Sequence, residues 1–208
     1  YQFNEDYNNL QTDLFKISLN NPIGLAAGFD KDGRIFNALF GIGFSFVEIG
    51  TVTPQPQFGN RKPRIARLVK DKALINSLGF NNHGALEMSE KLKNLKNRIK
   101  LEESLQRPRY FPDCILGINI GKNKITPIQN ASKDYVNVLK VLYPFADYFT
   151  LNLSSPNTKD LGSLQKGDAL NTLLENVCSC RDKLDYEHSL KTPILLKLSP
   201  DLKNNDLD

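Results

Sequence analysis

Six polar residues whose types suit ligand binding or catalysis lie in or shortly after short apolar runs of the sequence. They are Lys31, Thr51, Asn119, Ser155, Asn157 and Lys197. Asparagine amides donate to and accept from the N–H and C=O groups of a ring, hydroxyls do either, and lysine supplies positive charge for a carboxylate or an electron-rich ring. A converging set of these types therefore predicts a site for a planar, polar and anionic ligand.

The apolar runs that would position these residues are nearly continuous, which is typical of parallel strands covered on both faces. They cover residues 23–28, 44–50, 115–121, 148–153 and 193–198. Their alternation with helical patterns predicts an α/β fold with right-handed crossovers. Parallel α/β folds, open or closed, build ligand sites at the carboxyl ends of their strands, so the polar residues should meet at that edge.

Between the runs, apolar residues recur at helical spacing and predict helices. The expected buried faces are Ile35, Leu39 and Ile42; Met88, Leu92, Leu95 and Ile99; Tyr135, Val138, Leu139 and Leu142; and Leu170, Leu173, Leu174, Val177 and Leu184. The other face of residues 86–100 is rich in Lys and Asn, which indicates a solvated surface rather than a binding patch.

The composition fits one soluble globular domain. The chain has 208 residues, of which 40% are hydrophobic, enough for one sizeable core. Its 27 basic and 23 acidic residues give a formal charge of +4, too small and too dispersed for a nucleic-acid surface. Three cysteines argue against a disulfide framework and favour a reducing compartment. No apolar run reaches the roughly 20 residues of a membrane helix, and the first residues lack a signal-peptide pattern.

Common catalytic and metal-binding motifs do not account for the polar set. The sequence has no P-loop, dinucleotide fingerprint or complete calcium loop. His83 and His188 lie far apart without clustered acids or thiols, so we expect neither a metal site nor a Ser-His-Asp triad. Taken alone, SSPNT (154–158) is also typical of a turn after a strand, and Lys31 of a solvated charge. For single residues, both interpretations stay open.

Six motifs, taken together and in order, resemble one family. They are NPIGLAAGFDKDG (21–33), FVEIGTVTPQPQFGN (46–60), INSLGFNNHG (75–84), LGINIGKNK (116–124), NLSSPNT (152–158) and LLKLSPDL (195–202). Their order and approximate spacing are similar to those of class 2 dihydroorotate dehydrogenases. In class 1 enzymes of this family the base in the matching loop is a cysteine, so the serines of NLSSPNT indicate class 2.

The resemblance implies a (β/α)8 TIM barrel, of which residues 1–208 would be the amino-terminal part, with about the first five β/α units of a single FMN-binding domain. A complete barrel of this kind needs about 250 residues and eight strands. We therefore expect the last strands, and the amino-terminal helices by which class 2 enzymes meet the membrane, to lie outside this sequence. The implied location is the mitochondrial inner membrane in a eukaryote or, alternatively, the periphery of a bacterial cytoplasmic membrane.

The implied activity is the oxidation of dihydroorotate to orotate in de novo pyrimidine biosynthesis. Dihydroorotate would lose a hydride from C6 to N5 of the flavin and a proton from C5 to a serine base, and the electrons would pass to a ubiquinone-type quinone. A serine is a poor base unaided, and the sequence supplies no His or Asp partner for it. Geometry, a proton relay and the acidity that the substrate gains as hydride leaves would have to help.

Matching positions assign the expected site residues. The catalytic set is the base Ser155 with Thr158 and Phe80 in the proton relay. The FMN contacts are Ala26, Ala27, Gly28, Thr51, Asn119, Asn152 and Lys197. The substrate contacts are Lys31, Asn76, Ser77, Leu78, Gly79, Phe80, Asn152 and Asn157. The quinone or inhibitor tunnel would include Arg67 and Ala66, and Ala66 stands where the family usually has Phe. The roles of Asn81 and Asn82 stay open.

Two other functions remain as alternatives. One is another FMN-dependent pyrimidine oxidoreductase with a different electron acceptor, against which stand the serine in the base loop and the lack of Fe–S cysteine clusters. The other is an inactive barrel fragment that acts as a binding module. Against it stands the joint retention of Lys31, Asn119, Ser155, Asn157 and Lys197.

Overall fold

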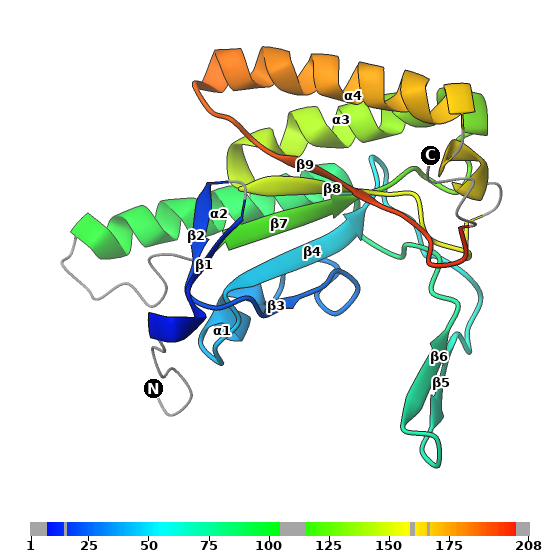
Figure 1. Cartoon of the computed structure of the whole chain (residues 1–208), viewed down its shortest axis with the longest axis horizontal. Helices are drawn as coiled ribbons and strands as arrows, with labels where there is room; N and C mark the ends of the chain where they lie inside the picture. Colours follow the sequence, from blue (N-terminus) through cyan, green and yellow to red (C-terminus); the bar gives the residue numbers. More distant parts are fainter. Residues whose placement is uncertain (1–7, 15, 105–114, 159–160, 166, 203–208) are drawn as a thin grey trace.

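The computed structural model describes residues 8–14, 16–104, 115–158, 161–165 and 167–202. Its centre is a sheet of five parallel strands in the order β3, β4, β7, β8, β9 (Figure 1). Their bounds are β3 Gly24–Leu25, β4 Phe46–Val52, β7 Ile115–Ile120, β8 Tyr148–Asn152 and β9 Ile194–Lys197. Each strand coincides with a predicted apolar run, although β3 is shorter than its run. The expected parallel sheet is therefore confirmed.

Three long helices lie along one side of this sheet, as Figure 1 shows. They are α2 (Gly84–Ser104), α3 (Ala131–Leu142) and α4 (Gly167–His188). Short 3₁₀ helices are η1 (Asn8–Leu10), η2 (Ile128–Asn130), η3 (Tyr143–Phe145) and η4 (Leu161–Gln165). Because the chain alternates between strands and these helices, each strand's carboxyl end opens into a loop on the same edge of the sheet.

The core lies between the sheet and the helices. Strand residues Val47, Ile49, Ile118 and Phe149 are fully buried in one cluster with the helical side chains. The predicted helical positions that are buried are Met88, Leu92, Tyr135, Val138, Leu139, Leu142, Leu173, Val177 and Leu184; Leu95, Leu170 and Leu174 are partly buried, and the side chain of Ile99 lies outside the described part. Most of the predicted helix faces are thus confirmed.

The predicted face of the first helix is wrong. Helix α1 spans only Phe36–Phe40, and its buried residues are Phe36, Leu39 and Phe40. Ile35 and Ile42 lie just outside it, 46% and 55% exposed. A helix of five residues makes little more than one turn, so a pattern that spans two turns cannot identify its buried face.

Two antiparallel hairpins were not predicted. One pairs β1 (Thr12–Leu14) with β2 (Ile17–Leu19), and the other pairs β5 (Ile65–Leu68) with β6 (Ala73–Asn76). Their strands have three or four residues, most of them exposed, so they lack the alternation that marks a half-buried strand. Figure 1 shows the β5–β6 hairpin extending away from the sheet.

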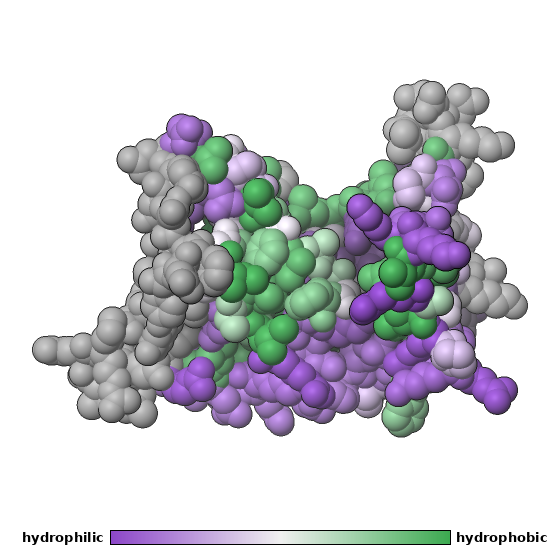
Figure 2. All heavy atoms as spheres, turned by 90° about the horizontal axis from the view of Figure 1, so that it is seen from below, coloured by the Kyte–Doolittle hydropathy of each residue, from purple (hydrophilic) through white to green (hydrophobic). Residues whose placement is uncertain are grey.

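The sheet is open, with β3 at one edge and β9 at the other, as expected of a partial (β/α) barrel. Seen from the side opposite α3 and α4, apolar side chains gather in the middle of the molecule (Figure 2). Among the described helices, none combines the length and apolar character needed to cross a membrane.

Candidate functional site

Three polar side chains from adjacent strands meet at the carboxyl ends of β4, β7 and β8. The hydroxyl of Thr51 donates to Oδ1 of Asn119 at 2.5 Å. The amide nitrogen of Asn152 donates to Thr51 Oγ1 at 3.0 Å and to Asn119 Oδ1 at 3.1 Å. All three residues are buried, so these mutual bonds satisfy polar groups that water does not reach. The structure thus brings together Thr51, Asn119 and Asn152, three of the expected FMN contacts.

The carboxylate of Glu48 orients this cluster, and the sequence analysis did not predict a role for Glu48. Its carboxylate accepts from Asn119 Nδ2 at 2.8 Å and from the hydroxyl of Thr150 at 2.6 Å. Burial is the larger cause that raises the pKa of Tyr148, and the charge of Glu48 adds to it. This phenol therefore stays protonated beside the carboxylate. The Asn119 amide therefore has a fixed orientation, with Oδ1 turned to Thr51 and Asn152. An acidic residue inside an otherwise apolar strand is the sequence signal that could have identified Glu48.

The loop after β8 separates the two serines of NLSSPNT. The hydroxyl of Ser154 donates to Asn152 Oδ1 at 3.0 Å, which ties it to the amide cluster. The Oγ of Ser155 accepts from the backbone N–H of Asn157 at 3.3 Å. In the described part of the chain, no acceptor takes the Ser155 hydroxyl proton. Ser155 is therefore the serine with a hydroxyl available for proton transfer, while Ser154 supports Asn152.

Asn60 joins the segment Asn76–Phe80 to the serine loop. Its backbone N–H donates to the carbonyl of Leu78 at 3.0 Å, and its side-chain nitrogen donates to the carbonyls of Ser77 at 3.0 Å and Asn157 at 3.5 Å. Because one side chain reaches both segments, the predicted substrate contacts and the predicted base lie on one side of the molecule. Phe80 and Thr158 are both buried, about 5% exposed.

Lys31 lies half-buried in the loop after β3, in a region of positive charge. Burial is the main cause that lowers the pKa of Lys31, and the nearby charge of Arg64 lowers it further. The charge of Asp32 acts in the opposite direction and raises this pKa. The nearby cations Lys31 and Arg64 favour an anion, since bound negative charge relieves their repulsion. The prediction that Lys31 suits an anionic ligand thus has an electrostatic basis.

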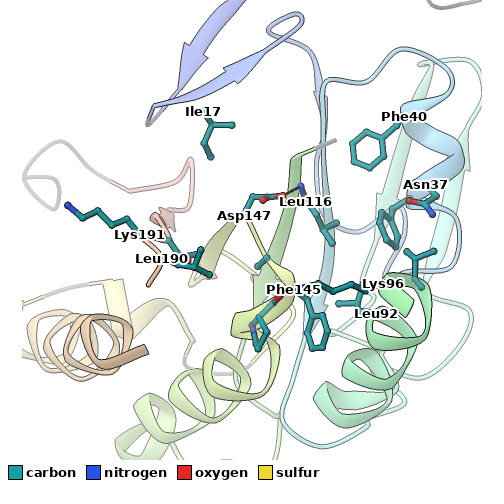
Figure 3. Close-up of a pocket in the computed structure, with 15 residues that line it drawn as sticks. Ile17, Asn37, Phe40, Leu92, Lys96, Leu116, Phe145, Asp147, Leu190 and Lys191 are labelled. Atoms are coloured by element: carbon teal, nitrogen blue, oxygen red, sulfur yellow. Dashed lines mark hydrogen bonds between the residues drawn. The ribbon is translucent and has the colours of Figure 1, made fainter. Parts of the chain in front are cut away.

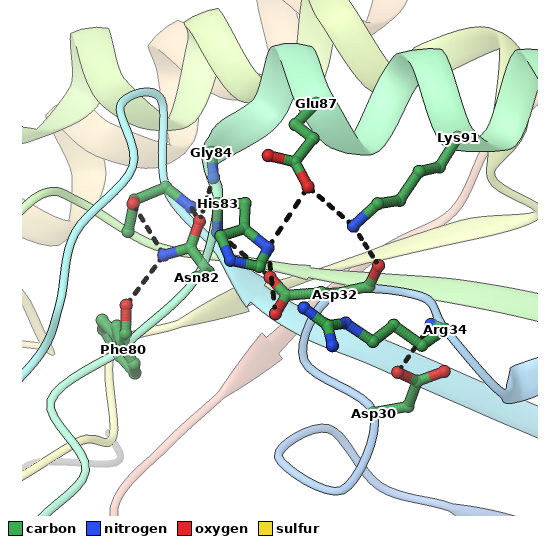
Figure 4. A network of polar contacts seen from close by, with 10 residues as sticks. Asp30, Asp32, Arg34, Phe80, Asn82, His83, Gly84, Glu87 and Lys91 are labelled. Carbon is green, nitrogen blue, oxygen red and sulfur yellow. Dashed lines mark hydrogen bonds and ion pairs between the residues drawn. The ribbon is translucent and has the colours of Figure 1, made fainter.

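Two acidic residues fix the loop that carries Lys31 (Figure 4). The Asp30 carboxylate accepts from the backbone N–H groups of Arg34, Ile35 and Phe36, each at 2.8 Å, at the start of α1. Asp32 Oδ1 accepts from the backbone N–H of His83 at 3.0 Å, and Asp32 Oδ2 lies 3.3 Å from His83 Nδ1.

Two residues of helix α2 add to the contact between Asp32 and His83. Glu87 lies 3.3 Å from His83 Nδ1 and 2.8 Å from Lys91 Nζ, and Lys91 also donates to the Asp32 carbonyl at 3.4 Å. The side chain of His83 is 45% exposed, and it links the loop to α2. The two segments that carry Lys31 and Phe80 are thereby held together.

Other predicted residues lie at the margins of this site. Lys197 ends β9 beside Asn152 in the sheet register, and its side chain is exposed. Arg67 and Ala66 lie on the exposed β5–β6 hairpin, which the structure does not bring into the amide cluster. The positions Ala26, Ala27 and Gly28 form the start of the loop after β3.

This loop can accept a flat ring close to its backbone. Gly28 has a φ of +110°, its N–H donates to the Gly50 carbonyl at 3.0 Å, and a Cβ placed there would meet nothing within 4 Å. Together with two alanines, it offers a backbone surface without bulky side chains beside Thr51. Within the described ranges, no group of three or more His, Cys, Asp or Glu side chains could hold a metal ion.

A cavity of about 550 Å³ lies at the opposite ends of the strands (Figure 3). Its lining includes Phe36, Phe40, Leu92, Leu116 and Asp147, and none of the predicted site residues. Leu116 is the second residue of β7 and Asp147 directly precedes β8, so this cavity lies at the amino ends of these strands. The polar chemistry described above is therefore separate from it.

Comparisons with known proteins agree on one family. A family model described as Dihydroorotate dehydrogenase matches residues 9–208. Proteins named dihydroorotate dehydrogenase (quinone) are 47% identical over 92% of this chain in Acinetobacter baylyi and 46% identical over 96% of it in Thermus thermophilus. The crystal structure of DHODH in complex with ferulenol from Eimeria tenella has 37% identity and a TM-score of 0.87 over 97% of the chain.

The matches cover only part of each relative. The chain spans 53% and 51% of the two named proteins and 55% of the Eimeria tenella chain. Within that span, the family model, the sequence identities and the fold all point to one group of proteins. The chain belongs to the dihydroorotate dehydrogenase family.

Proposed function

We propose that this chain is the amino-terminal part of a class 2 dihydroorotate dehydrogenase, which oxidises dihydroorotate to orotate and passes the electrons to a quinone. The observation that carries the proposal is the convergence of the Thr51–Asn119–Asn152 cluster, the free hydroxyl of Ser155 and the segment Asn76–Phe80 at one end of the parallel sheet. This convergence gives a planar anionic substrate both polar partners and a base.

The residues present fit FMN as the cofactor. The small residues Ala26, Ala27 and Gly28 would lie against the ring, and the amides of Asn119 and Asn152 with the Thr51 hydroxyl would hold its polar edge. Lys197, at the end of β9, would place positive charge near that edge and favour an electron-rich ring. When bound, FMN would accept the two electrons of the oxidation as a hydride.

The substrate carboxylate would lie between Lys31 and the segment Asn76–Phe80. Gly79 and Phe80 have φ angles of +71° and +51°, so both lie in the left-handed region of backbone conformation. No acceptor among the described residues takes the N–H of Gly79 or Phe80. These groups are therefore available to a carboxylate that the Lys31 ammonium neutralises.

Ser155 would remove the proton from C5 of the substrate. Its Oγ accepts from the Asn157 N–H, so the oxygen is held in one place while the hydroxyl proton stays free. A neutral hydroxyl can accept the C5 proton only if it passes its own proton on. We assign that relay to Thr158, with Phe80 as its apolar wall, because both are buried close to the loop ends that carry the base.

The electron acceptor would be a membrane quinone, and Arg67 and Ala66 on the β5–β6 hairpin would line its access. Such an acceptor requires peripheral contact with a membrane. The bacterial relatives support the bacterial alternative, and they give no support for the mitochondrial inner membrane. We therefore propose peripheral membrane association of the full-length protein.

The test uses the full-length protein and its Ser155→Ala variant. Wild type should be yellow, dihydroorotate should bleach its flavin absorbance within one turnover, and a quinone should restore it. Ser155→Ala should keep the flavin spectrum and slow bleaching by about a hundredfold or more, the usual contribution of a general base. Ser179→Ala, the same change on the exposed side of α4, should match wild type.

The results separate this function from the alternatives. A colourless full-length protein would favour the binding module, and a flavin that dihydroorotate bleaches but a quinone does not restore would favour another acceptor. Bleaching of Ser155→Ala at the wild-type rate would remove Ser155 from its role.

A further inference from the structure

A group of hydrogen-bonded polar side chains contacts the segment Asn76–Phe80, outside the residues that the family resemblance assigns to ligands. Its members are Thr53, Gln57, Asn82 and Asn123, and all but Gln57 are buried, at most 6% exposed. Asn123 Nδ2 donates to Thr53 Oγ1 at 3.1 Å and to Gln57 Oε1 at 3.0 Å. The group therefore joins the loop after β4, the loop after β7 and the start of α2 into one support.

Asn82 uses every hydrogen-bonding position of its side chain. Oδ1 accepts from the backbone N–H groups of Thr53 at 3.2 Å and Gly84 at 2.8 Å. Nδ2 donates to Thr53 Oγ1 at 2.9 Å and to the carbonyl of Phe80 at 2.7 Å (Figure 4). A buried amide with four partners has one orientation, so its contact with Phe80 is fixed.

Gln57 holds the same segment from the other side. Its Nε2 donates to the carbonyls of Gly79 and Phe80, both at 3.1 Å. Its Oε1 accepts from Asn123 Nδ2 at 3.0 Å and from the backbone N–H of Lys124 at 2.9 Å, which fixes which end of the amide faces the segment. Two side-chain amides therefore converge on the Phe80 carbonyl.

These contacts determine where the backbone N–H groups of the segment point. In a trans peptide the C=O and N–H bonds are opposed. The Gly79 carbonyl is held by Gln57, so the Phe80 N–H points away from the support. The Leu78 carbonyl is held by the Asn60 N–H, so the Gly79 N–H points away from Asn60. Phe80, a non-glycine residue at positive φ, needs such contacts, because that conformation is otherwise unfavourable.

We propose that Gln57 and Asn82 are positioning residues for substrate binding: by holding the Gly79 and Phe80 carbonyls they fix the backbone of Phe80 and present its N–H group to the substrate carboxylate. The inference rests on the proposed function and deepens it, since it names residues that touch neither substrate nor cofactor. It also gives Asn82 a role that the sequence left open.

The test uses variants that keep size and remove the donor. In the full-length flavoprotein, Gln57→Glu and Asn82→Asp each replace an N–H₂ group by an oxygen that faces a carbonyl. Gln57→Met removes the donor without adding charge. Orotate is titrated against the oxidised enzyme, and its Kd is read from the change in flavin absorbance.

We expect each variant to retain its flavin and to bind orotate about tenfold more weakly or worse, the effect of losing one well-made buried hydrogen bond or more. The KM for dihydroorotate should rise by a similar factor, while quinone should reoxidise the reduced flavin at the wild-type rate. A protonated carboxyl can donate again, so lowering the pH from about 8 to about 5.5 should restore part of the affinity of Gln57→Glu relative to wild type, but not that of Gln57→Met.

Matched controls carry the same changes on exposed surfaces. Gln129→Glu and Asn94→Asp should bind orotate like wild type. Wild-type affinity for orotate in all three test variants would overturn the inference. Loss of flavin from all three would also overturn it, because Gln57 and Asn82 would then support the whole fold. A wild-type protein with flavin but no affinity for orotate would instead refute the proposed function.

Discussion

The carboxylate of Glu48 should control the stability of the sheet interior and the orientation of Asn119. It accepts hydrogen bonds from Asn119 Nδ2 at 2.8 Å and Thr150 Oγ1 at 2.6 Å. Glu48→Ala leaves both donors without this partner, and each unsatisfied buried group costs about 1 to 3 kcal/mol. We therefore expect the free energy of unfolding to fall by about 2 to 6 kcal/mol.

Glu48→Gln should cost much less, about 1.5 kcal/mol or below, because the amide oxygen can still accept from Asn119 and the Thr150 hydroxyl can turn to accept from the amide nitrogen. Urea unfolding of the full-length protein measures both values, and flavin retained on gel filtration reports on Asn119. The flavin content should fall in Glu48→Ala and stay near wild type in Glu48→Gln.

The exposed Glu90 of α2 supplies the control for charge removal, and Glu90→Ala should stay within about 0.5 kcal/mol of wild type. If Glu48→Ala were as stable as wild type, or if the Gln and Ala variants lost equal stability, hydrogen bonding by this carboxylate would not support the cluster.

Two further predictions concern stability. Asp30→Ala should lower the free energy of unfolding by about 1 to 3 kcal/mol, because three backbone N–H groups lose their acceptor at the start of α1. Urea unfolding measures this loss against Asp13→Ala, the same change at an exposed position. Equal stability of the two variants would contradict the prediction. Burial and then hydrogen bonding to Asp185 raise the pKa of Tyr143 to about 12, so the stability due to its neutral form is complete below about pH 10 and lost as the pH rises toward 12. Tyr143→Phe should weaken this alkaline loss in thermal melts at increasing pH, and an unchanged slope would contradict it.

The strands and most buried helix faces could be predicted from the sequence because burial on both sides leaves a local record. The runs at 115–121 and 148–153 are apolar nearly throughout, and α3 presents its buried residues at regular spacing. The buried face of helix α1 and the β5–β6 hairpin escaped prediction, since these elements are too short for a period to be detected.

The ordered motifs determined the family, and with it the candidate residues Lys31, Asn119 and Ser155. The contacts that tie Ser154 to Asn152, fix the Asn119 amide and hold Asn82 and Gln57 depended on the tertiary structure alone. The Thr150–Glu48 bond joins residues 102 positions apart, and the Asn123–Gln57 bond joins residues 66 apart. A local pattern records which residues are buried, but the partner that satisfies a buried polar group comes from whichever strand or loop the fold places beside it.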